Sequence, residues 1–74
     1  MNNFMKKANH IYDKFLKDTV EQKGVSEVEI CMITKGVFPV IIHFIGGEKV
    51  KVNVKGDKRI AFSLAGKIMT KGKK

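Results

Sequence analysis

Hydrophobic positions near the start of the chain recur at steps of three and four residues, and charged positions fill the gaps between them. This period is typical of an amphipathic helix that packs one side on a core. We expect the helix to end at Lys23, because Gly24 can adopt the left-handed backbone that closes a helix. The apolar positions of this helix are Phe4, Ala8, Ile11, Tyr12, Phe15, Leu16 and Thr19 or Val20.

The middle of the chain changes to a period of two, which is typical of β-strands. The pattern predicts a first strand over residues 27–33, a tight turn at Lys35 and Gly36, and a second strand over residues 37–45. Gly46 and Gly47 predict a two-residue hairpin. A third strand over residues 49–55 should place valines on one face and lysines on the other, at an edge of the sheet.

A second helix is expected after Gly56, with Asp57 as its N-cap. Its apolar side consists of Ile60, Ala61, Leu64, Ala65, Ile68 and Met69, and residues 70–74 are expected to fray. The order is therefore α-β-β-β-α. This order predicts a single α+β domain over residues 1–74, in which two helices pack on one face of a three-stranded antiparallel sheet.

Charge is unevenly distributed along the 74 residues. Residues 48–74 contain nine Lys or Arg and two acidic residues, whereas residues 1–47 contain six Lys and five acidic residues. The net charges are 9 − 2 = +7 and 6 − 5 = +1, which add up to the +8 of the whole chain. Such a concentration of positive charge favours a nucleic-acid partner, although surplus lysine also serves solubility.

Other classes of function find little support in the composition. The single cysteine, Cys31, cannot form an internal disulfide and fits a reducing, cytoplasmic location. No apolar run approaches 18 residues, so no membrane partner is expected. His10 and His43 lack neighbours at metal-ligand spacing, and no catalytic arrangement is recognisable. We therefore expect neither a cofactor, nor a metal, nor an enzymatic activity.

The segment DKRIAFSLAGKIM, residues 57–69, resembles the second helix of the double-stranded-RNA-binding domain. In that family a Ser-Lys-Lys-x-Ala-Lys start leads into an Ala-rich helix, and here Asp57, Lys58, Arg59 and Ala61 take the matching positions. The segments VIIHFIGGEKVKVNVKG and LKDTVEQKGV are similar to the family's second and third strands and to the end of its first helix. The resemblance covers about 60 residues in the same order.

The resemblance implies that the chain binds the shape of an RNA duplex with little sequence preference. Basic residues at the start of the second helix would hold phosphates across the major groove, and the outer side of the first helix would reach a minor groove. The implied nucleic-acid-binding residues are Lys55, Lys58, Arg59, Lys14, Lys17 and Asp18.

Three positions differ from the family pattern. The loop between the first two strands lacks the usual Gly-Pro-x-His, Phe62 replaces a third cation, and Asp18 is shorter than the usual Glu or Gln. These differences leave an alternative open. The chain could be a protein-interaction module, for example a small inhibitor or adaptor of phage origin, that keeps the fold and binds an acidic protein partner.

The second strand is apolar on both of its faces, yet helices can cover only one face of the sheet. An exposed apolar face is typical of an interface with another copy, as in a homodimer, or with another protein. Deeper burial of the strand beneath the first helix would explain the same pattern. The residues of this expected interface are Cys31, Ile33, Val37, Ile41, His43 and Ile45.

Overall fold

The structure, a computed structural model, describes residues 3–31 and 35–73. A helical segment made of α1 (Asn3–Ile11), η1 (Tyr12–Leu16) and α2 (Lys17–Lys23) comes first. Strands β1 (Val25–Ile30), β2 (Val37–Phe44) and β3 (Lys49–Lys55) follow, and helix α3 (Lys58–Lys71) comes last. The strands form one antiparallel sheet in the order β1-β2-β3. The predicted α+β class and three-stranded antiparallel sheet are confirmed.

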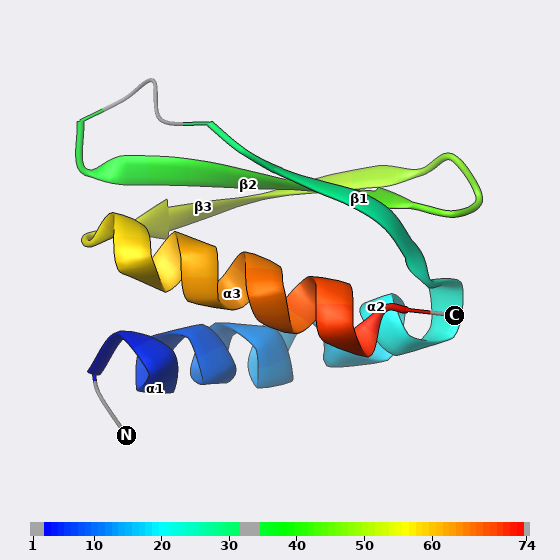
Figure 1. Cartoon of the computed structure of the whole chain (residues 1–74), viewed down its shortest axis with the longest axis horizontal. Coiled ribbons are helices and arrows are strands. Elements are labelled where there is room, and N and C mark those ends of the chain that lie inside the picture. The colour runs from blue at the N-terminus through cyan, green and yellow to red at the C-terminus, as the bar shows by residue number, and fades with distance from the viewer. Residues whose placement is uncertain (1–2, 32–34, 74) are drawn as a thin grey trace.

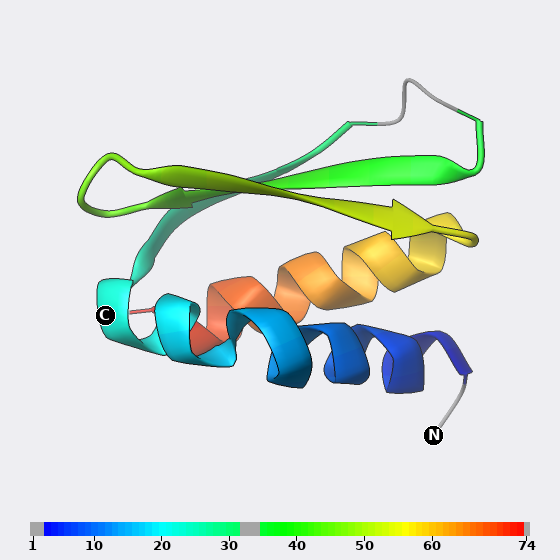
Figure 2. The ribbon, with the colours of Figure 1, turned by 180° about the vertical axis from the view of Figure 1, so that it is seen from behind.

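The molecule has two layers, with the sheet on one side and the helices on the other (Figure 1). Helices α1 and α3 lie side by side and run in the same direction, so both begin at the same end of the molecule (Figures 1 and 2). Near their starts the guanidinium of Arg59 lies 4.5 Å from the centre of the Phe4 ring. Further along, Lys67 Nζ donates to Asn9 Oδ1 at 2.9 Å.

The core fills the space between the two layers. Alternate residues of β2 point into it, together with one side of each helix, as the two sequence periods predict. Phe15 and Met69 are exceptions, because both were expected on the apolar sides of the helices and both are exposed. Burying the apolar surface of the core is the main stabilising contribution in such a small domain. The buried residues are Ala8, Tyr12, Leu16, Val20, Val25, Val40, Ile42, Phe44, Val54, Ile60, Ala61, Leu64 and Ile68.

The first helical segment contains a π-helical turn that the sequence analysis did not predict. Its buried residues Ala8, Tyr12, Leu16 and Val20 recur every four residues. In an α-helix of 3.6 residues per turn, each such step would rotate the buried side by about 40°. The wider turn, in which Lys17 N donates to Tyr12 O, offsets this rotation and keeps all four side chains on the core.

Strand β1 ends at Ile30, earlier than predicted. Cys31 N donates to Pro39 O at 2.9 Å, but Pro39 has no N–H to return the second bond of this pair. Pairing with β1 therefore stops there, whereas β2 continues to pair with β3 as far as Val37. Lys35 and Gly36 form a turn immediately before β2, as predicted.

Two other boundaries also needed correction. Strand β2 ends at Phe44, whose carbonyl accepts a 3.0 Å hydrogen bond from Gly47 N in the turn, and the turn into β3 spans residues 45–48 rather than two glycines. Thr70 and Lys71 form the last turn of α3 instead of fraying. Gly72 is buried and accepts a 2.8 Å hydrogen bond from Val25 N, which ties the end of α3 to the start of β1.

Candidate nucleic-acid interface

Several basic residues lie at the end of the molecule where both long helices begin. We call this end the basic pole, and it comprises Lys6, Lys7, Lys35, Lys55, Lys58 and Arg59, with His10 beside them. The hydrogen bond from Gly56 N to Gly36 O, 2.9 Å long, brings the connection before β2 against the turn before α3. Among the described residues Asp57 is the one carboxylate at this pole, so the side chains named here carry a net charge of 6 − 1 = +5.

Asp57 is committed to organising the start of α3. Its Oδ1 accepts a hydrogen bond of 2.8 Å from Arg59 N, which confirms the predicted N-cap. The same carboxylate accepts from Arg59 Nε at 3.0 Å and from Arg59 Nη2 at 2.6 Å. These bonds from the Arg59 side chain, followed by the one from its backbone N–H, lower the pKa of Asp57 from 3.8 to about 2. Asp57 therefore stays charged and fixes the guanidinium in place.

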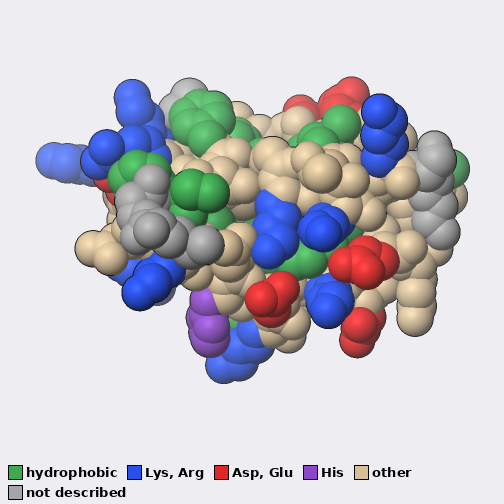
Figure 3. Space-filling model, turned by 60° about the horizontal axis from the view of Figure 1, so that its bottom comes forward, with side chains coloured by type: hydrophobic (Ala, Val, Ile, Leu, Met, Phe, Trp, Pro, Cys, Tyr) green, Lys and Arg blue, Asp and Glu red, His purple; other side chains and the backbone are tan. Residues whose placement is uncertain are grey.

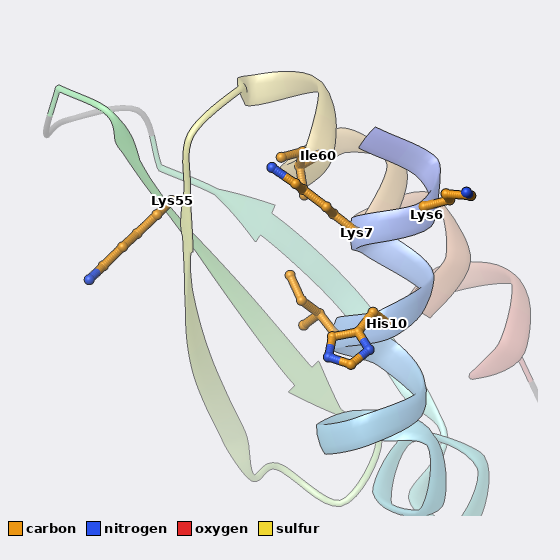
Figure 4. A pocket seen from close by; sticks show the side chains of 6 residues that line it. Lys6, Lys7, His10, Lys55 and Ile60 are labelled. Atoms are coloured by element: carbon orange, nitrogen blue, oxygen red, sulfur yellow. The ribbon is translucent and has the colours of Figure 1, made fainter. Parts of the chain in front are cut away.

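Arg59 is consequently a positioned cation rather than a mobile one. Its guanidinium is clamped by Asp57 on one edge and lies over the Phe4 ring on one face. By contrast, no ion pair within residues 3–31 and 35–73 involves Lys55 or Lys58. Both lysines are exposed. Lys55 extends away from the end of β3 into solvent (Figure 4).

A hollow of about 290 Å³ lies between α1 and the end of β3. Ile11 and Ile60 give it an apolar floor, whereas Lys6, Lys7 and His10 stand at its rim on the side of α1 (Figure 4). An uncharged surface can rest on such a floor while the rim attracts an anionic group. The sequence analysis did not include these three α1 residues in the site.

The acidic side chains are concentrated away from the basic pole. Figure 3 looks at the helix side and shows Lys and Arg across much of this face, with a dense group at one end, whereas the visible Asp and Glu lie mainly in the other half. Apart from Asp57, all acidic residues belong to η1, α2, β1 or the turn before β3. The basic pole thus has a positive field that little negative charge offsets.

The remaining predicted RNA contacts lie elsewhere. Lys14 is in η1, and Lys17 and Asp18 are in α2, all of them exposed. At a rise of 1.5 Å per residue, Lys17 is about 20 Å along the helical segment from Phe4. The structure therefore brings Lys55, Lys58 and Arg59 together at one pole and leaves Lys14, Lys17 and Asp18 at a separate place.

The expected protein interface maps mainly to the side of the sheet that faces away from the helices. Val37, Ile41 and His43 are half-buried there, and Cys31 is half-buried just beyond the end of β1. Ile45 lies in the turn before β3 and is 58% exposed, so it does not belong to the strand as predicted. Ile33 is outside the described residues.

A group of potential metal ligands on this face was also missed, because its members come from different strands. Glu27, Glu29 and His43 each offer one ligand atom, and these atoms lie within 4.8 Å of one another. His43 Nε2 already contacts Glu29 Oε1 as an ion pair across the strands. Both glutamates are exposed and His43 is half-buried, so this surface group does not have the enclosed geometry of a structural metal site.

No family model, no curated protein and no solved structure matches the chain. Within the part of the chain that the structure describes, no helix is long and apolar enough to cross a membrane.

Proposed function

We propose that the protein is a non-enzymatic RNA-binding domain whose basic pole contacts the phosphates of double-stranded or otherwise structured RNA. The observation that carries this proposal is that six cationic residues from α1, β3, α3 and the segment before β2 lie at one end of the molecule. Lysines that have no acidic partner of their own are available to neutralise phosphates, which is the main source of affinity for a nucleic-acid backbone.

The helices add to this attraction. Helices α1 and α3 both begin at the basic pole, and the exposed N–H groups and dipoles of helix N-termini favour anions. Lys58 stands in the first turn of α3, where a positive charge is mildly unfavourable for the helix itself. A bound phosphate would turn this unfavourable placement into a favourable one.

The parallel pair of helices on one sheet face supports a fold like the double-stranded-RNA-binding domain. In such an arrangement Lys14, Lys17 and Asp18 would be the second contact, about 20 Å from the basic pole along the helical segment. A duplex can bridge this separation, whereas an isolated phosphate cannot. The hollow beside Lys7 and His10 would suit the uncharged surface of a nucleotide next to its phosphate. Recognition would follow shape and have little sequence dependence.

The test is fluorescence anisotropy with a labelled 20-base-pair RNA duplex at several salt concentrations, beside a matched DNA duplex and single-stranded RNA. We expect the RNA duplex to bind most tightly and the affinity to fall steeply with salt. Lys55→Gln combined with Lys58→Gln should weaken binding about tenfold or more and lower the salt slope by about two. Arg59 is left intact because it supports the start of α3.

The matched control is Lys71→Gln combined with Lys73→Gln, which removes the same charge at the opposite end of α3. The control variant should bind nearly as tightly as the unchanged protein. Equal losses in both double variants would show that only net charge matters and would overturn the assigned site. Equally weak binding to all three nucleic acids would reject the proposed function and favour the acidic protein partner.

A further inference from the structure

The face of the sheet opposite the helices carries its charges in stripes. The strands lie in the order β1-β2-β3, and the register aligns Glu27 with His43 and Lys49, and Glu29 with Ile41 and Lys51. One edge of this outer face is therefore acidic and the other is basic, and the strip between them is largely apolar. The outer face consists of Glu27 and Glu29 from β1, Val37, Pro39, Ile41 and His43 from β2, and Lys49, Lys51, Asn53 and Lys55 from β3.

The apolar strip is open to solvent on this side. Val40, Ile42 and Phe44 of β2 are buried against the helices, so the residues between them project from the opposite side. Val37, Pro39, Ile41 and His43 are only half-buried, and the helices of the structure all lie on the other face (Figures 1 and 2). A half-covered apolar strip with charged borders is typical of an interaction surface rather than of a fully solvated sheet.

We infer that the outer face associates with the outer face of a second copy of this chain, through a two-fold axis parallel to the strands. Such an axis places β1 of each copy over β3 of the other, because it exchanges the two edges of the sheet. Glu27 and Glu29 of one copy then face Lys49 and Lys51 of the other, and the two β2 strips meet in the middle. A two-fold axis perpendicular to the strands would instead place like charges over each other, which is unfavourable.

The size of the face limits the strength of this dimer. Three strands about 4.8 Å apart and about seven residues long cover on the order of 350 Å² per copy. Stable interfaces usually bury about 800 Å² per partner. The dimer is therefore weak, with a Kd on the order of 1–100 µM.

This geometry has a consequence for ligand binding. A rotation about an axis parallel to the strands leaves both copies pointing the same way along the strands. Both basic poles therefore lie at the same end of the dimer, where one polyanion can contact the two together. Two linked contacts can raise avidity without any new contact in either copy.

The test is analytical ultracentrifugation of the full chain from about 5 µM to 500 µM at 0.15 M salt, with a chelator present so that no metal ion joins the copies. The mass should rise with concentration from 8.3 kDa towards twice that value. Glu27→Lys with Glu29→Lys, and separately Lys49→Glu with Lys51→Glu, should each weaken self-association at least tenfold. An equimolar mixture of these two variants should form the dimer again, which also shows that both are folded.

A variant that carries all four substitutions should self-associate like the unchanged protein. Its β1 edge is then basic and its β3 edge acidic, so opposite charges still face each other in the dimer. A monomer at every concentration would overturn the proposal and leave the outer face to a different protein. Self-association that survives both charge reversals, or a mixture that stays monomeric, would overturn the assigned geometry. The measurement needs no nucleic acid, so its result is independent of the proposed RNA binding.

Discussion

The two ends of the molecule use their charged side chains in different ways. At the end where α3 finishes, Lys23 Nζ lies 2.6 Å from Glu48 Oε1 and 5.6 Å from the centre of the Phe44 ring. Lys67 donates to Asn9 and stands 4.0 Å from Asp13. At the basic pole, Lys55 and Lys58 have no such acidic partner among the described residues. Lys23 and Lys67 therefore contribute to the architecture, whereas Lys55 and Lys58 are left available for a ligand.

This contrast shows why net charge alone is a poor guide to a binding site. Lys67 belongs to the strongly basic second part of the sequence, yet its amine is engaged by the first helical segment. Lys6 and Lys7 belong to the nearly neutral first part, yet they lie at the basic pole. The arrangement in space, rather than the order along the chain, separates structural cations from binding cations.

Disrupting the end where α3 finishes should have the largest effect on stability. A Cβ added at Gly72 would lie 2.4 Å from Val25 Cγ2, closer than two carbon atoms can approach. Gly72→Ala should therefore lower the free energy of unfolding by about 1–3 kcal/mol in urea denaturation. Gly66→Ala is the control, because nothing lies within 4 Å of a Cβ at this helical position. It should instead raise stability by about 0.5–1 kcal/mol.

Replacing one lysine at each end of α3 by methionine tests directly whether Lys67 is structural and Lys58 binds RNA. Lys67→Met should cost about 0.5–1 kcal/mol of stability through the lost contacts with Asn9 and Asp13, and should leave RNA affinity unchanged. Lys58→Met should leave stability within about 0.5 kcal/mol and weaken RNA binding several-fold. Thermal melts measure the stability of each variant, and fluorescence anisotropy measures its affinity for the RNA duplex. If both variants lose the same stability and the same RNA affinity, the proposed difference between the two ends is wrong.

The smallest expected effect is the loss of stability at low pH that is due to Asp57. The folded-state pKa of Asp57 is lowered to about 2 from 3.8, chiefly by the hydrogen bonds from the Arg59 side chain. Because the folded pKa is below the unfolded one, the contribution of Asp57 to stability is complete above about pH 4. It is lost as the pH falls through that range towards 2. Asp57→Asn should remove this part of the pH dependence, measured as Tm against pH. If, below about pH 4, Tm falls as steeply in this variant as in the unchanged protein, Asp57 is not the group responsible.

Much of the fold could be predicted because its patterns are local. The period of the helices, the period of the strands, and Asp57 before an apolar run each depend on neighbouring residues. The exceptions have non-local causes. Strand β1 stops at Ile30 because a proline lies opposite on β2. Gly72 accepts a hydrogen bond from Val25, which is far away in the sequence. The π-helical turn was detectable in principle, because four-residue steps from Ala8 to Val20 do not fit a straight α-helix.

The site was only partly predictable from the same information. Lys55, Lys58 and Arg59 are close in sequence, so their grouping at the start of α3 was visible. Lys6, Lys7 and His10 were missed, although the order of elements places them. Five successive elements that each reverse direction make the first parallel to the fifth, so α1 must begin where α3 begins. The bond between Asp57 and Arg59 was hidden, because a side-chain conformation decides it.

Pro39 makes one region of the protein unusually easy to re-engineer. Since the described pairing of β1 with β2 ends at Ile30 and Val40, residues added to the connection between β1 and β2 would not have to fit that pairing. Each doubling of such an insertion should cost only about 0.6 kcal/mol in loop entropy. The end of this connection lies beside the basic pole, because Gly56 N donates to Gly36 O. New recognition sequences can therefore be grafted next to the cationic surface while the remaining scaffold stays as it is.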